Sequence, residues 1–250
     1  MKTIISYSGG LGSFTAAYDA LWASNDVELV FCDTLTEDID LYRFLEETVR
    51  FLKVPFTRIA DGRNIWQVQY DVKYQANSRI DPCSRVLKRE LFKKYMRDNH
   101  TPETAEIVIG IDHTEAHRRG DFEVNHAPFT VRFPLCDRRY DREHILDVLD
   151  KAGIRPPRLY DLDFPHNNCG GFCVKAGQRQ AKLLLDKLPE TYAWHEKQQE
   201  AVITLMGKKH GTIRKMVDGV THYLTLREFR EMVERGETIE KYVEGNCACF

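Results

Sequence analysis

Short apolar runs alternate along the chain with longer segments in which apolar residues recur at helical spacing. The short runs predict five strands, at 3–8, 27–34, 56–61, 105–112 and 129–135. The longer segments predict helices between and after them, at 13–24, 37–54, 86–99 and 141–153. Because strand and helix alternate, we expect an α/β fold: a doubly wound, mainly parallel five-stranded sheet with helices on both faces.

The pattern changes after Pro156. Residues 175–188 and 189–206 read as helices, and Asp218–Gly219 predicts a small hairpin that a last helix follows. We therefore expect two parts: an α/β domain over 1–156, and a smaller, mostly helical C-terminal module over 157–250. We expect this module, which contains cysteines, to end in a mobile tail.

Composition narrows the class of protein. The 250 residues include 36 Lys and Arg against 38 Asp and Glu, a formal charge of −2, so nothing overall favours nucleic acid. The segment 197–215 is locally basic, and it is interpreted either as a contact for a nucleic acid acceptor or as a solvated helix face. The N-terminus lacks a secretory leader pattern, and no apolar run approaches membrane-spanning length. We expect a cytoplasmic protein with no membrane partner.

The stretch "SYSGGLGS" directly follows the first predicted strand. Glycines let a backbone approach an anion closely, and the free amides of a helix start favour phosphate. The loop has no lysine, so it is not a "GxxxxGK[ST]" loop, and it does not match "GxGxxG". A tight turn without a ligand is the alternative. We expect the loop to bind a nucleotide's phosphates through Ser8, Gly9, Gly10, Gly12 and Ser13.

These residues resemble the "SGGxDS" loop of the adenine nucleotide alpha-hydrolase superfamily, in its phosphoadenosine phosphosulfate (PAPS) reductase-like and PP-loop ATP pyrophosphatase branch. Further segments resemble this branch in order: "LVFCDT", "DPCSRVLKRELF", "GIDHTEAHRR" and "FPL…LYDLDFPHNNCGGFC". The resemblance implies nucleotide contacts by Asp33, Thr34, Gly110 and Glu115, and catalytic roles for Lys88 and Arg119. A helix cap at Asp33 and an exposed basic face are the alternatives for these side chains.

Two departures from the family pattern stand out. Gly12 occupies a position where many ATP pyrophosphatases carry Asp, and the cysteine pair Cys169/Cys173 is spaced C-x3-C rather than C-x2-C. Replacing Gly12 with Asp is then expected to restore or raise turnover if the loop is a weakened catalyst.

Seven cysteines in a chain expected to be cytoplasmic suggest metal or redox chemistry. The resemblance implies a four-iron cluster; zinc, or cysteines that are merely structural, are the alternatives. The expected ligands are Cys83, Cys169, Cys173 and Cys247. In PAPS reductases a tail cysteine attacks the substrate sulfur, so Cys247 and Cys249 are also candidate catalytic nucleophiles.

The resemblance leaves three functions open. The favoured one cleaves ATP, with Mg²⁺, to AMP and pyrophosphate, and so adenylates an acceptor for transfer of sulfur from a sulfur donor. The second is a sulfonucleotide reductase that acts on PAPS with a tail cysteine and an external thiol reductant. The third is a non-catalytic module that binds nucleotide and metal.

Overall fold

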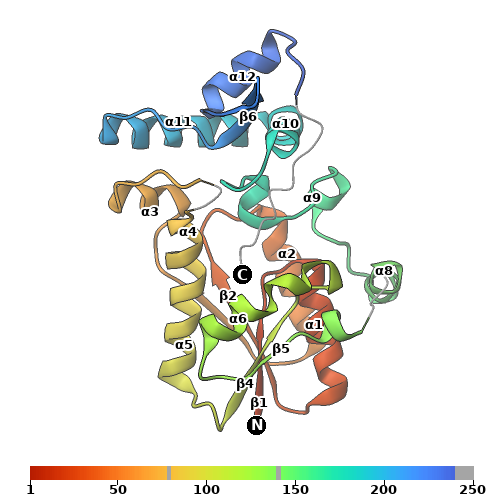
Figure 1. Ribbon diagram of the computed structural model, residues 1–250. Coiled ribbons are helices and arrows are strands. Elements are labelled where there is room, and N and C mark those ends of the chain that lie inside the picture. Colours follow the sequence, from red (N-terminus) through yellow and green to blue (C-terminus); the bar gives the residue numbers. More distant parts are fainter. Residues whose placement is uncertain (78–79, 139–141, 240–250) are drawn as a thin grey trace.

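A sheet of five parallel strands lies at the centre of the molecule (Figure 1). The computed structural model describes residues 1–77, 80–138 and 142–239. The strand order is β3-β2-β1-β4-β5, and every neighbouring pair runs parallel. The strands are β1 (Lys2–Ser6), β2 (Val27–Asp33), β3 (Phe56–Ala60), β4 (Ala105–Ile109) and β5 (Val131–Arg132). The predicted doubly wound α/β class is confirmed.

Helices cover both faces of the sheet. Apolar residues of α1, α2 and α8 pack on one face, and those of α5 and α6 pack on the other. Strands buried on both faces read as continuous apolar runs, which explains why β1, β2 and β4 were visible in the sequence. The α-helices up to residue 151 are α1 (Leu11–Ala23), α2 (Ile39–Leu52), α3 (Ile65–Asp71), α4 (Pro82–Ser84), α5 (Leu91–Asn99), α6 (Arg119–His126), α7 (Pro134–Asp137) and α8 (Arg142–Lys151). No helix in the described ranges is long and apolar enough to cross a membrane.

Two shorter helical types complete this part of the chain. A π-helical turn, η1 (Arg85–Glu90), joins α4 to α5, and a 3-10 helix, η2 (His113–Arg118), precedes α6. The fifth strand is shorter than the predicted run 129–135. Pro134 has no amide hydrogen for a ladder bond, and it begins α7 instead.

Helix α2 is strongly amphipathic, and its ends are clearly defined. The Asp38 side chain accepts a hydrogen bond from the Asp40 amide at 2.9 Å and caps the N-terminus. The helix stops at Lys53, whose φ of 55° places it in the left-handed region. Its buried side includes Leu41, Phe44 and Leu52. Because α2 follows β2, its polar N-terminal turn lies near the carboxyl ends of the strands.

The remainder of the chain forms a second layer, which Figure 1 shows above the carboxyl ends of the strands. Its elements are α9 (Arg158–Asp161), the 3-10 helix η3 (Asn168–Gly171), α10 (Gln178–Lys187), α11 (Pro189–Met206), β6 (Ile213–Val217), β7 (Val220–Leu224) and α12 (Leu226–Glu234). The predicted hairpin is present, and its turn residues Asp218 and Gly219 both have positive φ.

This layer shares an apolar core with earlier residues. Trp66 of α3 and Leu87 of η1 lie in one buried cluster with Tyr192 of α11 and Phe229 of α12. Trp66 also donates a hydrogen bond from Nε1 to Nδ1 of His195 at 2.9 Å. The predicted division at residue 156 stays a prediction, but residues on both sides of it build this core.

Candidate functional site

From β1 the chain adds β2 and β3 on one side, and then β4 and β5 on the other side, so the strand order reverses between β1 and β4. Such a switch point opens a crevice at the carboxyl ends of the strands, where open α/β sheets bind ligands. The glycine loop follows β1 at this point, and Gly110 follows β4. A Cβ placed on Gly12 would lie 2.6 Å from the carbonyl oxygen of Gly110, and one placed on Gly110 would lie 2.6 Å from that of Gly12. Both positions therefore require glycine so that the two backbones can touch.

The close approach to Gly110 explains why position 12 is glycine, which the sequence alone did not show. The expected test, restoring Asp at position 12, would push a side chain into the Gly110 carbonyl. Such a variant would disturb the loop whether or not the protein is a catalyst. We therefore withdraw Gly12→Asp as a test of lost catalysis.

The glycine loop is held in shape by its own serines. Ser8 Oγ donates to Ser13 Oγ at 3.2 Å, and Ser13 Oγ donates to the Gly10 carbonyl at 2.9 Å. Gly9 has a φ of +75°, and a Cβ there would meet Leu41 at 2.5 Å. Gly10 is the N-cap of α1 and has no side chain to cap it. The Leu11 amide donates to the Tyr160 hydroxyl at 3.5 Å, and Gly10 offers no side-chain acceptor to the other amides of this first turn.

A cavity of about 250 Å³ opens over this loop. Its wall combines the glycine loop, the loop after β4, the start of α8 and the segment around α9. The lining residues are Ser8, Gly10, Leu11, Gly12, Ser13, Thr15, Gly110, Asp112, Glu115, Leu135, Arg142, Ile145, Tyr160, Pro165, His166, Asn167 and Asn168. Six of the predicted nucleotide-binding residues are thus brought together here: Ser8, Gly10, Gly12, Ser13, Gly110 and Glu115.

Residues 155–168, which we call the cover segment, form one wall of the cavity. Buried Asn167 donates from Nδ2 to the Gly9 carbonyl at 3.1 Å. The Tyr160 hydroxyl lies 3.5 Å from the Leu11 amide, at the N-terminus of α1. Burial raises the pKa of Tyr160, so its hydroxyl stays protonated at neutral pH. Tyr160 and Asn167 therefore both reach the glycine loop from a distant part of the sequence.

The cavity has charged groups of both signs. The Arg142 guanidinium lies 5.6 Å over the ring of Tyr160, in cation–π geometry. Opposite charge comes from Asp112, which caps η2 by accepting from the Thr114 amide at 2.8 Å, and from Glu115, which pairs with buried Arg118. The cavity wall therefore combines the N-terminus of α1, one arginine and two carboxylates.

Asp33 and Thr34 lie outside this cavity wall. Asp33 is fully buried at the end of β2, where it accepts hydrogen bonds from the Leu35 amide at 2.8 Å and from the Tyr42 hydroxyl at 2.9 Å and pairs with Arg58. Thr34 donates to Glu37 at 2.9 Å. Both side chains have local partners, and their nucleotide contacts stay a prediction.

Lys88 is buried beside the glycine loop rather than in the main cavity. Its Nζ lies 3.9 Å from Oε1 of Glu37, whose pKa is raised by burial. With Cys32 and Ser8 it lines a small neighbouring cavity of about 20 Å³. Since Ser8 belongs to both cavities, Lys88 is adjacent to the candidate site without lining it.

Arg119 is also absent from the cavity lining. Its guanidinium pairs with Asp137 at 3.0 Å and lies 5.1 Å over the ring of Phe133. Catalytic roles for Lys88 and Arg119 are therefore still predictions, and the structure gives each residue other partners.

The described cysteines do not form a metal-binding set. Cys83 and Cys169 belong to one buried apolar cluster, and Cys173 is buried next to Ala176. Among the described residues, no group of three or more His, Cys, Asp or Glu side chains is placed to hold a metal ion. Cys247 and Cys249, the remaining expected ligand and nucleophiles, lie outside the described residues.

Sequence reasoning did not single out three groups of the cavity: Asp112, Arg142 and Tyr160. Tyr160 stands within the quoted "LYDL" segment, so its place in a family-like motif was the available signal. Asp112 likewise stands within the quoted "GIDHTEAHRR" segment. Arg142 carries no comparable signal, because a charged residue near a helix start is an ordinary surface feature.

No family model matches the chain, and comparison with curated proteins gives no significant match. Among solved structures it is similar to a PAPS reductase from Candida auris in complex with phosphate, at 14% identity over 66% of this chain and 79% of that one, with a TM-score of 0.46. It is also similar to a predicted subunit of tRNA methyltransferase from Methanocaldococcus jannaschii, at 17% identity over 62% and 90% of the two chains, with a TM-score of 0.39. At these identities a likeness concerns the fold alone, and the function has to be argued from the residues of the site.

Proposed function

We propose that the chain is an adenine-nucleotide-binding enzyme of the adenine nucleotide alpha-hydrolase superfamily, in the PAPS reductase-like and PP-loop branch. The observation that carries the proposal is the contact between Gly12 and Gly110, which places an uncapped helix start at the switch point of the sheet. A glycine backbone and a helix N-terminus without a side-chain cap suit the phosphates of a nucleotide. The cavity's 250 Å³ is close to the roughly 300–1,000 Å³ usual for small-molecule sites.

The reaction we propose is cleavage of ATP to AMP and pyrophosphate. An acceptor oxygen attacks the α-phosphorus, the bond from that phosphorus to the β-phosphate's bridging oxygen breaks, and pyrophosphate leaves. A sulfur donor then displaces AMP from the adenylated acceptor. The amides at the start of α1 and the Arg142 guanidinium stabilise the charge that develops on the phosphates. The Tyr160 hydroxyl and the Asn167 amide keep the loop and its ligand in register.

Mg²⁺ is part of the proposal. Mg²⁺ usually binds through one or two carboxylates together with substrate phosphates, and Asp112 and Glu115 supply carboxylates in the wall. Bound there, it would neutralise phosphate charge.

The described cysteines alone form no group of three or more that could hold a metal, so no step is assigned to an iron–sulfur cluster or zinc. The predicted metal set, with Cys247, stays a proposal for iron and zinc analysis. A Cys169→Ser variant that retains the metal content of the parent would refute it.

The test uses anaerobically purified protein with Mg²⁺, offered ATP and PAPS in parallel. Release of AMP and pyrophosphate from ATP supports the adenylating sulfur-transfer enzyme. Sulfite and adenosine bisphosphate from PAPS would make it a sulfonucleotide reductase instead. Binding of ATP without turnover, across sulfur donors and candidate acceptors that include RNA, would support the non-catalytic module. Failure of both nucleotides to bind would refute the nucleotide site itself.

A further inference from the structure

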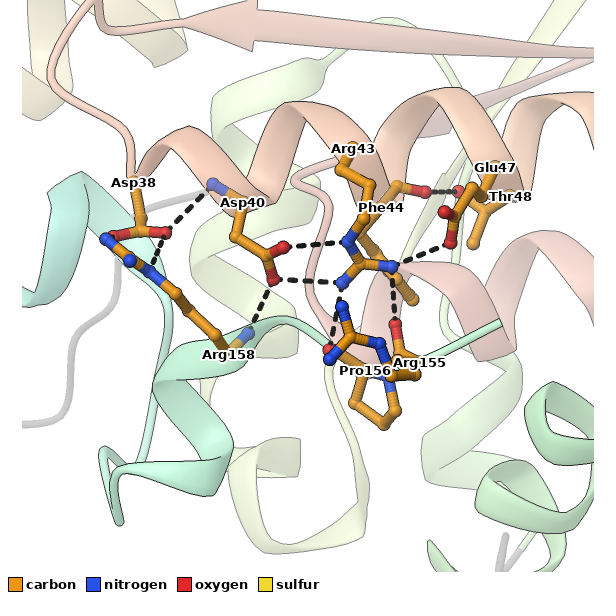
Figure 2. Close-up of polar contacts among 9 residues, drawn as sticks. All are labelled: Asp38, Asp40, Arg43, Phe44, Glu47, Thr48, Arg155, Pro156 and Arg158. Atoms are coloured by element: carbon orange, nitrogen blue, oxygen red, sulfur yellow. Dashed lines mark hydrogen bonds and ion pairs between the residues drawn. The ribbon is translucent and has the colours of Figure 1, made fainter. Parts of the chain in front are cut away.

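Charged side chains at the start of α2 form hydrogen bonds and ion pairs with the cover segment (Figure 2). Arg158 donates from Nε and Nη2 to the two carboxylate oxygens of Asp38, at 2.8 and 2.7 Å. The Arg158 amide donates to Asp40 Oδ2 at 2.7 Å. We call Asp38, Asp40, Arg43 and Arg158 the α2 clasp.

Arg43 completes the clasp from within α2. It donates to both oxygens of Asp40, at 2.7 and 2.9 Å, and these bonds hold the pKa of Asp40 below its usual range. The same guanidinium reaches across to the carbonyl oxygens of Arg155 at 3.0 Å and Pro156 at 3.1 Å. Arg43 is thus bonded to its own helix and to the start of the cover segment at once, as Figure 2 shows.

This geometry differs from that of an ordinary surface ion pair. The Asp38 side chain is 7% exposed, its pair with Arg158 is bidentate, and backbone groups of the cover segment are bonded as well. Isolated exposed pairs contribute little, whereas bidentate pairs within a set of charges fix geometry. The clasp is therefore suited to setting the position of a segment.

Directly after the cover segment, the chain is held against the loop that precedes α2. The Cys169 amide donates to Oε2 of Glu37 at 2.6 Å. Gly170 approaches the chain so closely that a Cβ there would lie 2.9 Å from the Thr36 carbonyl oxygen. Between these two attachments lie Tyr160 and Asn167, the residues that contact the glycine loop.

We infer that Arg158 and Arg43 are positioning residues of the nucleotide site: the α2 clasp holds the cover segment where Tyr160 and Asn167 meet the glycine loop. The inference rests on the proposed function for its ligand. Neither arginine lines the cavity, so each acts through the segment that it holds.

The test compares Arg158→Ala and Arg43→Ala with Arg50→Ala. Arg50 lies on the same helix and forms an ion pair with Glu46 at 2.8 Å, but both side chains are more than two-thirds exposed and touch no part of the clasp. ATP affinity with Mg²⁺ is measured by calorimetry. Amide hydrogen exchange of residues 8–13 and 155–168 is measured without nucleotide.

We expect ATP to bind roughly tenfold more weakly to each clasp variant and exchange in both segments to rise, with Arg50→Ala unchanged. Arg158→Lys, which keeps the charge but loses the bidentate contact, should fall between the parent and Arg158→Ala; it also serves if the alanine variant does not fold. Exchange and affinity equal to those of Arg50→Ala would overturn the inference. If the parent binds no ATP while exchange still rises in the variants, the proposed function fails and the positioning role stands.

Discussion

Single residues decide whether the crevice can exist, and Gly12 is the sharpest case. In Gly12→Ala the added Cβ falls 2.6 Å from the Gly110 carbonyl oxygen, so the backbones must separate. We expect a loss of roughly 1–3 kcal/mol of unfolding free energy and a severe loss of ATP binding. Denaturant titration and calorimetry measure these two effects.

Gly120 is the matched control for that substitution. It lies in α6, and a Cβ there meets nothing within 4 Å. Gly120→Ala should therefore leave ATP binding unchanged and stabilise the protein by up to about 1 kcal/mol, as alanine does in a helix. Equal behaviour of the two variants would mean that the Gly12–Gly110 contact is not needed.

The substitution Tyr160→Phe removes one hydroxyl group and so tests the contribution of that group to the site. Its contact with the Leu11 amide is long, 3.5 Å, so Tyr160→Phe should barely change stability. A hydroxyl at the start of α1 is well placed to bond a phosphate, and its loss should weaken ATP binding by about 0.5–1.5 kcal/mol, or roughly two- to tenfold. Tyr70→Phe, on the exposed side of α3, is the control. An unchanged affinity in Tyr160→Phe would remove this hydroxyl from the site.

At the scale of elements, the sequence predicted the elements whose signals are local. The apolar runs of β1, β2 and β4 and the periodicity of α2 needed no tertiary information, and the glycine loop could be identified because its residues are contiguous. The cover segment could not be placed in this way. Asn167 meets Gly9, and Arg158 meets Asp38, through contacts more than 100 residues apart in sequence. No spacing rule links positions so distant, so the contacts of the cover segment with the glycine loop and with α2 became known only from the fold.

His195 of α11 makes the contact between α11 and α3 sensitive to pH. It is buried against Phe172 and accepts the Trp66 Nε1 hydrogen, and burial lowers its pKa to about 3. The unfolded chain takes up the proton near pH 6.5 and the folded chain does not. The folded state therefore loses stability as the pH falls from about 6.5 towards 3, by up to about 1.4 kcal/mol per pH unit, and is unaffected by this group above pH 6.5.

Thermal unfolding between pH 4 and 8 measures that effect. His195→Gln should be less stable than the parent at pH 8, because the replacement packs poorly against Phe172. It should also lose less stability on acidification than the parent does. Parallel pH profiles for the two proteins would show that His195 is not the group that titrates.

At the scale of the whole molecule, the two layers depend on each other. Trp66, Leu87 and other apolar residues before residue 156 are buried in one cluster with residues that follow it, among them residues of α11 and α12. A fragment of residues 1–156 should therefore expose this apolar surface, bind a hydrophobic dye and self-associate in light scattering, since large exposed patches favour association. It also lacks Tyr160 and Asn167, so it should not bind ATP even where its sheet forms. A monomeric fragment that unfolds cooperatively at the parent's temperature would instead establish residue 156 as a true domain boundary. The shared core would then add little to the stability of the α/β part.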